Sequence, residues 1–207
     1  MQDFIEKTIK VKIEFTEPIL GAVPRDKEIY TNYIAGQVKQ ETLREEIERI
    51  GEVAAVDKRT CGFLMDEDGN LVLSNHVIKG FFKEAAKSIR RISAKKYESH
   101  KMTAYIQKVD TLIHVYPRFI TLHTPEPVEE CMEEFQRACR VSTPQGDRIT
   151  LKNSERLPEG TTAEFEIQLM DETHEKVVKE WLDYGRFHGL GEWRNADYGR
   201  FEWMELE

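Results

Sequence analysis

The sequence predicts an α+β fold with the βαββαβ order of the ferredoxin-like topology, in which two helices cover one face of an antiparallel sheet. Two segments, residues 8–15 and 161–170, alternate apolar and polar residues with the period of two that is typical of half-buried strands. Two others, residues 77–89 and 175–184, repeat apolar residues at helical spacing. A β-rich segment follows each predicted helix, and this sequence of element types gives the predicted topology.

The first predicted strand, residues 8–15, is followed by a segment that contains Pro18, Gly21 and Pro24. Proline and glycine interrupt regular structure, so the strand is expected to end there. Apolar residues then recur at helical spacing over residues 40–50 among Glu and Arg. This pattern predicts a short surface helix inserted after the first strand.

Two short apolar runs, residues 63–65 and 71–73, flank the sequence Asp66-Glu67-Asp68-Gly69-Asn70. Because Asp-Gly favours tight hairpin turns, the segment predicts a small β-hairpin. Ser74 or Asn75 is expected to cap the next helix by accepting a hydrogen bond from its free amides. A polar and basic stretch after Ile92 predicts a loop.

The segment 112–122 is rich in β-forming residues, but Pro117 cannot donate a hydrogen bond to a sheet and predicts an edge strand or a bulge. Residues 149–152 continue the β pattern, and a turn at 157–160 precedes the strand of residues 161–170. After the helix of residues 175–184, four glycines mark a loop, and residues 200–204 form the predicted last strand. The chain is expected to be one domain, 1–207, with insertions at about 22–60 and 93–110.

Composition restricts the class of protein. The 207 residues carry a formal net charge of -8, and no uncharged apolar run reaches the ~18 residues of a membrane-spanning helix. The charged amino terminus does not resemble a signal peptide. Three cysteines without a CxxC pair argue against a disulfide framework, and the six histidines lack HxxxH or HxH spacing. We therefore expect a cytoplasmic protein without a membrane partner, a cofactor or a metal site.

The negative net charge conceals a basic segment between residues 79 and 108. Nine Lys and Arg residues face only two acidic residues there, a local sum of +7, so the rest of the chain carries -15. Such a stripe favours an anionic partner at one place on the surface, although a solvated helix face is an equal alternative. The predicted contacts are Lys79, Lys83, Lys87, Arg90, Arg91, Lys95, Lys96 and Lys101.

Three segments resemble motifs of the RAMP superfamily, the RNA-binding proteins that form the backbones of CRISPR effector complexes and supply their RNA-processing ribonucleases. They are residues 13–21, residues 70–80 and the glycine-rich residues 189–201. The resemblance spans nearly the whole chain and implies a RAMP/RRM-like domain. It also implies RNA or single-stranded nucleic acid as partner, and self-assembly into an oligomer along the strand.

The chain resembles more closely an uncharacterised family of small proteins from phages and prophages of Gram-positive bacteria. Similar residues lie at 78–82, 181–185 and 191–201. This second resemblance implies a phage origin and a bacterial host cytoplasm. It leaves open a different function, in which an acidic surface binds or imitates a host CRISPR complex.

The glycine-rich loop is suited to a phosphate backbone, because glycine lets the chain approach closely and arginine supplies paired donors. The predicted contacts here are Gly191, Arg194 and Arg200, with Trp193 and Tyr198 as a surface for stacking bases. An alternative is that the arginines pair with nearby acids such as Glu192 and Asp197, while Trp193, Phe201 and Trp203 belong to the core.

Catalysis is the less favoured hypothesis, and no catalytic residue is assigned. In a metal-independent ribonuclease, His76 would move the proton of the 2′-hydroxyl, and Lys79 and Lys83 would stabilise the developing charge. In a metal-dependent alternative, Asp26 or Asp57 would assist cleavage. A histidine at a helix start is more often a surface residue, so we expect a binding protein.

Overall fold

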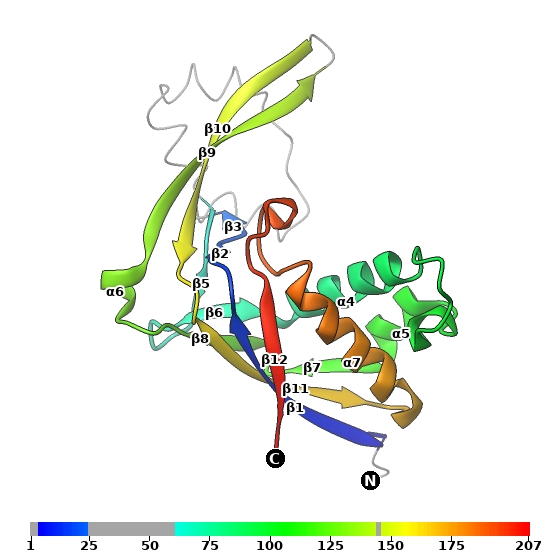
Figure 1. Cartoon of the computed structure of the whole chain (residues 1–207). Coiled ribbons are helices and arrows are strands. Elements are labelled where there is room, and N and C mark those ends of the chain that lie inside the picture. Colours follow the sequence, from blue (N-terminus) through cyan, green and yellow to red (C-terminus); the bar gives the residue numbers. More distant parts are fainter. Residues whose placement is uncertain (1–3, 25–60, 144–145) are drawn as a thin grey trace.

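The computed structural model describes residues 4–24, 61–143 and 146–207 (Figure 1). The ferredoxin-like topology predicted from the sequence is confirmed. The elements that build it are β1 (Lys7–Phe15), α4 (Asn75–Ile89), β7 (Ile113–Tyr116), β8 (Phe119–His123), β11 (Thr162–Leu169), α7 (Glu175–Asp183) and β12 (Phe201–Leu206).

The larger sheet of the described residues has the order β12-β1-β11-β8, and β7 also pairs with β11. β1 is antiparallel to both of its neighbours, with Val11 opposite Phe165 of β11 and Glu205 of β12. This is the arrangement that the βαββαβ order produces. The predicted hairpin is also present: β5 (Leu64–Met65) and β6 (Leu71–Ser74) extend the sheet beyond β8.

Pro117 separates β7 from β8, as the sequence predicts for a residue that cannot donate to a ladder. Tyr116 lies opposite Glu166 of β11, and Leu122 lies opposite Ala163. The step from 116 to 122 is six residues and the step from 163 to 166 is three, so three extra residues form a bulge. β8 then leaves β11 and pairs with β6.

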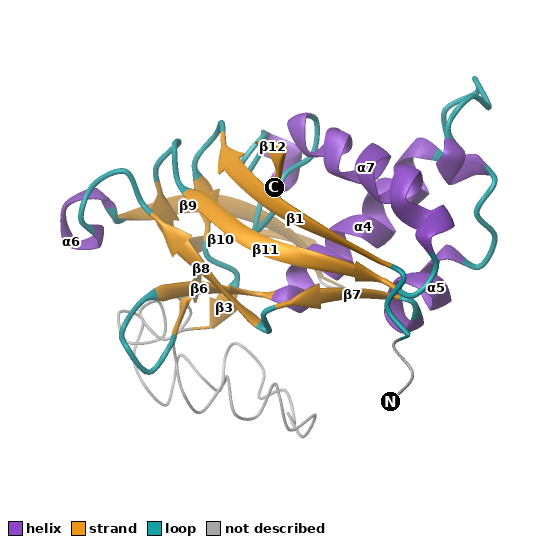
Figure 2. Cartoon of the chain, turned by 90° about the horizontal axis from the view of Figure 1, so that it is seen from below, coloured by secondary structure: helices purple, strands orange, loops and turns teal. Residues whose placement is uncertain are grey.

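The core lies between the larger sheet and helices α4 and α7, which are on the same side of it (Figures 1 and 2). The alternate residues Ile9, Val11, Ile13 and Phe15 of β1 are fully buried, while Lys10 and Glu14 are exposed on the open face. The aromatic residues of α4 and α7 meet in this core, where the ring centroids of Phe82 and Trp181 are 5.6 Å apart.

A second sheet stands beside the first and contains a long hairpin, β9 (Glu133–Thr143) and β10 (Gly146–Leu157). The short strands β2 (Ile19–Leu20) and β4 (Cys61–Gly62) pair with β10, and β3 (Val23–Pro24) pairs with β4. The sequence analysis identified only residues 149–152 of this hairpin. It missed β9, whose alternation is weakened by charged residues on both faces.

The start of α4 corrects one expectation. Ser74 is the N-cap residue, but its side chain accepts no hydrogen bond from the helix amides. Its Oγ instead lies 2.7 Å from Nδ1 of His76, and the Asn75 side chain donates to the carbonyl of Val115 on β7. The Ser74 hydroxyl thus contacts a side chain of the first helical turn, and Asn75 links the helix to the sheet. In the described part of the chain, no side chain caps the helix amides.

The predicted insertion at 93–110 has structure of its own. It contains the 3₁₀ turn η1 (Glu98–His100) and the helix α5 (Tyr105–Thr111). Short helical segments also occur at α6 (Val128–Cys131), η2 (Glu172–His174), η3 (Tyr184–Arg186) and η4 (Arg194–Ala196). The helix expected at 40–50 lies outside the described residues. No helix in the described part of the chain is long and apolar enough to cross a membrane.

Candidate nucleic-acid interface

One flank of α4 uses its lysines to hold α5. The Nζ of Lys83 lies 2.6 Å from the Asp110 carboxylate, and the Nζ of Lys79 donates to the Asp110 backbone carbonyl at 3.3 Å. Burial lowers the pKa of Lys79, while the charge of Asp110 opposes that shift. Both predicted contacts are therefore engaged within the protein.

Two further cations of the stripe stabilise the segment after α4. Arg90 donates to the carbonyls of Ser99 and Met102, and its guanidinium lies 5.5 Å from the centroid of the Tyr105 ring. Lys101 pairs with Glu98 at 2.7 Å. The Glu180 carboxylate on α7 accepts hydrogen bonds from the amides of residues 98 and 99. The segment is therefore bound both to Arg90 at the end of α4 and to α7.

Four other cations of the stripe project into solvent, whereas Lys108 is half-buried. Lys87, Arg91, Lys95 and Lys96 are exposed, and the Nζ of Lys96 lies 5.4 Å from the centroid of the Tyr97 ring. Among the described residues, no hydrogen bond or ion pair engages the side chains of Lys87, Arg91 or Lys95. These four are the cations of the stripe that are most available to an external anion.

The glycine-rich loop packs closely against the segment that follows β1. Gly191 has a φ of +81°, and a Cβ atom there would lie 2.5 Å from the carbonyl oxygen of Leu20. The amide of Glu192 donates to that carbonyl, and the amide of Gly199 donates to the carbonyl of Pro18. Gly191 is thus required by backbone geometry, whatever the loop binds.

An ion-pair cluster joins the glycine-rich loop to α4. Glu84 on α4 pairs with Arg194, and its other oxygen lies 3.2 Å from Nε2 of His188. Arg200 pairs with Asp197. The alternative in which the loop arginines pair with acids is therefore confirmed for Arg200, whereas the partner of Arg194 is Glu84 and neither acid of the loop.

An aromatic cluster lies where the loop meets the β9–β10 hairpin. Trp193 stacks on Tyr198 with ring centroids 5.4 Å apart and an interplanar angle of 15°, and Phe135 of β9 lies beside both. Trp193 is 40% exposed, whereas Phe201 is buried, so only the latter confirms the expectation of a core residue. Trp203 is partly buried and donates to Asp183.

Sequence reasoning missed the two basic residues that the hairpin contributes to this place. Arg137 of β9 lies with its guanidinium 4.7 Å from the centroid of the Trp193 ring. Its Nη2 donates to Glu192 at 3.0 Å, and the Nζ of Lys152 on β10 lies 2.6 Å from the other oxygen of Glu192. These residues belong to β9 and β10, outside the basic segment that the charge pattern singled out.

A polar pocket of about 430 Å³ opens among these groups, lined by Arg137, Lys152, Arg194, Glu84 and Glu192. The side chain of Arg137 is 7% exposed, and its Nε and Nη1 have no hydrogen-bond partner among the described residues. An unsatisfied buried donor costs roughly 1–3 kcal/mol, and more for a charged group, so these two unpaired atoms are unfavourable for stability.

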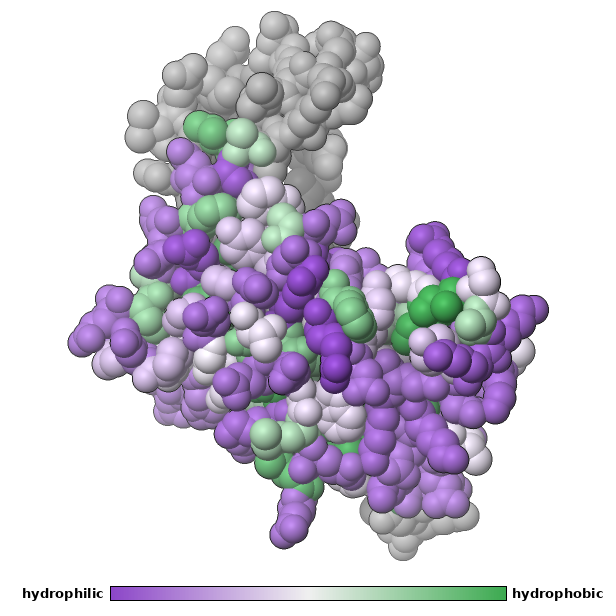
Figure 3. Space-filling model, viewed as in Figure 1, coloured by the Kyte–Doolittle hydropathy of each residue, from purple (hydrophilic) through white to green (hydrophobic). Residues whose placement is uncertain are grey.

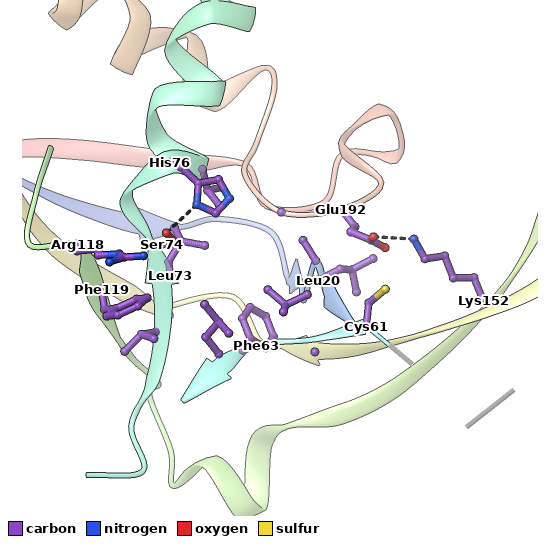
Figure 4. A pocket seen from close by; sticks show the side chains of 17 residues that line it. Leu20, Cys61, Phe63, Leu73, Ser74, His76, Arg118, Phe119, Lys152 and Glu192 are labelled. Atoms are coloured by element: carbon purple, nitrogen blue, oxygen red, sulfur yellow. Dashed lines mark hydrogen bonds and ion pairs between the residues drawn. The ribbon is translucent and has the colours of Figure 1, made fainter. Parts of the chain in front are cut away.

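A second, mainly apolar pocket of about 600 Å³ lies next to it (Figure 4). Glu192 and Lys152 face each other at one end, and His76 and Arg118 lie at the other. Burial raises the pKa of the Cys61 thiol in its wall, and the charge of Glu192 adds to that shift.

The ribonuclease hypothesis gains nothing from the geometry. His76 is exposed, but the amines of Lys79 and Lys83, its expected helpers, are engaged by Asp110. Asp26 and Asp57 lie outside the described residues. Within residues 4–24, 61–143 and 146–207, no group of three or more His, Cys, Asp or Glu residues could hold a metal ion.

Comparison with known proteins shows the fold. No protein-family model matches the sequence, and no curated protein sequence matches it. Among solved structures, a chain of the Type III-B Cmr-beta complex bound to cognate target RNA is similar, with a TM-score of 0.53 and 12% sequence identity. The similarity covers 97% of this chain but only 59% of that one.

Cmr6 from Pyrococcus furiosus shows a weaker likeness, with a TM-score of 0.48, 12% identity and coverage of 95% of this chain and 97% of Cmr6. The likeness to the Cmr-beta chain shows a shared fold. The resemblance to a phage family has no support from these comparisons.

Proposed function

We propose that this protein is a non-enzymatic, RAMP-like module that binds RNA or another single-stranded nucleic acid. The observation that carries the proposal is the Glu84 cluster. Because Glu84 pairs with Arg194 and lies 3.2 Å from His188, the glycine-rich loop lies directly against α4, which carries Lys87 and is followed by Arg91. The two predicted binding segments thereby form one continuous surface.

This surface has the two features that single-stranded nucleic acids require. Exposed cations follow one another from α4 into the next loop at Lys87, Arg91, Lys95 and Lys96, and can track a phosphate backbone. The exposed indole of Trp193 supplies aromatic surface at the other end of the path. The similar Cmr-beta chain belongs to a complex that is bound to RNA, which supports the same partner class.

The predicted contacts divide by role within this proposal. Lys79, Lys83, Arg90 and Lys101 are engaged by the protein and position the basic surface, whereas the four exposed cations contact the ligand. Arg194 and Arg200 exchange their carboxylate partners for phosphates. We further propose that the chain is a single cytoplasmic domain of phage origin that assembles into an oligomer along the strand.

A second candidate function is favoured by the open face of the larger sheet. Glu14, Glu164 and Glu202 are exposed there, and Lys12 is already paired with Glu164. Such an acidic face fits a basic protein surface, and a host CRISPR complex is the partner that the phage resemblance implies. The first function requires that the protein bind nucleic acid, whereas the second requires that it bind another protein.

The test is fluorescence anisotropy with a labelled 20-nucleotide oligouridylate at 50 and 200 mM salt. The double variant Lys87→Glu/Arg91→Glu is expected to weaken binding at least ~10-fold and to flatten the logarithmic salt dependence by about 1.4, since each single-strand phosphate contact contributes about 0.7. The matched control is Lys10→Glu/Arg118→Glu, which makes the same charge change at exposed residues elsewhere.

Wild-type binding that is lost equally in both variants would reduce the interaction to bulk charge and contradict the proposed surface. Absence of binding by the wild type would favour the protein-directed candidate.

A further inference from the structure

The guanidinium of Arg137 has two hydrogen-bond donors without acceptors among the described residues. Its side chain is 7% exposed, and a single atom, Nη2, donates to Glu192. In a guanidinium group, Nη2 belongs to both two-donor edges, one shared with Nε and the other with Nη1. Because Nε and Nη1 are buried without acceptors among the described residues, each edge has one idle donor. A planar or tetrahedral oxyanion is the ligand that fills such an edge.

The pocket already holds one oxyanion from the protein. The two oxygens of Glu192 are 3.0 Å from Nη2 of Arg137 and 2.6 Å from Nζ of Lys152, and Ser154 Oγ donates to Glu192 at 3.4 Å. The carboxylate thus occupies the position between two cations that belong to different strands. A phosphate with three peripheral oxygens could satisfy the same cations and the idle donors together.

The backbone on both sides of Glu192 has an uncommon conformation. Gly191 and Trp193 on either side of it have φ values of +81° and +52°, so both lie in the left-handed region. For a tryptophan this conformation is uncommon, and such strained residues cluster at ligand-binding positions. Glu192 belongs to the loop and to neither strand, so displacement of its side chain does not require β9 or β10 to move.

The charges of the pocket agree with an anionic ligand. Arg137, Lys152 and Arg194 contribute +3 and Glu84 and Glu192 contribute -2, which leaves +1 with His188 neutral. Withdrawal of Glu192 leaves +2 around a position next to the 40% exposed indole of Trp193. Cationic donors beside exposed aromatic surface match a phosphate that is attached to a base, better than they match free phosphate.

We propose that Arg137 and Lys152 form a nucleotide-phosphate subsite in which Glu192 is a built-in competitor that the phosphate displaces. The subsite rests on the proposed function, because it assigns a place on the same surface to one nucleotide of the strand. It adds Arg137, Lys152 and Glu192, of β9, β10 and the glycine-rich loop, to the surface formed by α4.

The test is calorimetric titration of the full chain with adenosine 5′-monophosphate, adenosine and inorganic phosphate at 50 mM salt. Lys152→Gln is expected to weaken the monophosphate at least ~10-fold. Glu192→Gln keeps the size of the side chain but removes the competing charge, so it is expected to strengthen binding ~5-fold or more. A purely structural Glu192 would give the opposite sign.

Lys12→Gln is the matched control, because Lys12 has the same 34% side-chain exposure as Lys152 and is likewise paired with a glutamate, Glu164. Arg137→Gln is a further variant, but its buried position makes Lys152→Gln and Glu192→Gln decisive. Equal binding in Lys152→Gln and Lys12→Gln, or no gain in Glu192→Gln, would overturn the subsite. Phosphate that binds as tightly as the monophosphate would overturn the nucleotide assignment.

The oligouridylate titration separates this failure from failure of the proposed function. Oligonucleotide binding that depends on Lys87 and Arg91 but not on Lys152 would refute the subsite alone. Monophosphate binding with the expected signs in a chain that binds no oligonucleotide would uphold the subsite and refute the strand-binding function.

Discussion

The core and the glycine-rich loop region use aromatic and charged residues in opposite ways. In the core, Phe82 and Trp181 are fully buried, and the indole nitrogen of Trp181 donates to the buried Ser99. In the loop region, Trp193 is exposed, lies in a left-handed conformation and covers an arginine with idle donors. This pair of core aromatics is enclosed by the protein, whereas the loop region has exposed aromatic surface and unpaired arginine donors.

α4 likewise combines side chains that are used within the protein with side chains that remain exposed. Its inner face consists of buried apolar residues, one flank is paired with Asp110, and the exposed remainder carries Lys87, with Arg91 just after its end. Most of the face seen in Figure 3 is hydrophilic. Charge on α4 is thus partly structural and partly available, which composition alone does not reveal.

The largest expected effect is on the core. Phe82→Ala should lower the free energy of unfolding by about 3–5 kcal/mol, because it removes a fully buried ring that packs on Trp181. Trp193→Ala should lower it by only about 1–2 kcal/mol, since that ring is partly exposed and loses mainly its contacts with Tyr198 and Phe135. Urea denaturation followed by far-UV circular dichroism measures both. Equal losses would show that the loop region is part of the core.

The core could be predicted because its signals are local. Alternation in residues 8–15 and the apolar stripe of residues 77–89 each follow from a buried face with a fixed period. Pro117 marked the bulge for an equally local reason, the missing amide. β9 escaped detection because charged residues occur on both of its faces, where Arg137 turns inward and Glu133 and Glu134 remain exposed.

The residues of the proposed binding surface could be predicted only in part. Charge density found the stripe after residue 79, but it did not show that Lys83 would pair with Asp110 on a helix 27 residues away. Arg137 and Lys152 carry no sequence signal of their own, because they reach Glu192 only through the pairing of β9 with β10 and the return of the loop. Contacts between residues 40 or 55 positions apart depend on the fold.

A smaller effect tests whether the loop geometry is built for close packing. Gly191→Ala should lower the free energy of unfolding by about 1–3 kcal/mol, because it places a side chain at a φ of +81° and a Cβ 2.5 Å from the Leu20 carbonyl oxygen. Gly80→Ala is the matched control. A Cβ at Gly80, in α4, meets nothing within 4 Å, so the substitution should stabilise the protein by about 0.5–1 kcal/mol. The same denaturation measurement reports both signs, and a destabilised Gly80→Ala would contradict the packing of α4.

The smallest effect concerns a titratable group of the core, His174, which lies in η2 before α7 and is 6% exposed. Burial lowers its pKa below 6.5, although Asp171 opposes this shift and Lys108 adds to it. Below pH 6.5 the unfolded chain therefore binds a proton that the folded chain does not, so the free energy of unfolding falls as the pH is lowered. The carboxylates with lowered pKa, such as Glu175, begin from 4.5 or below and titrate at lower pH.

Denaturation of the wild type at pH 7.5 and 5.5 should show this loss, and His174→Gln should reduce the difference between the two values. His114→Gln, at an exposed residue of β7, is the control and should leave the difference unchanged. If both variants retained the full difference, the acid sensitivity would not arise from the burial of His174.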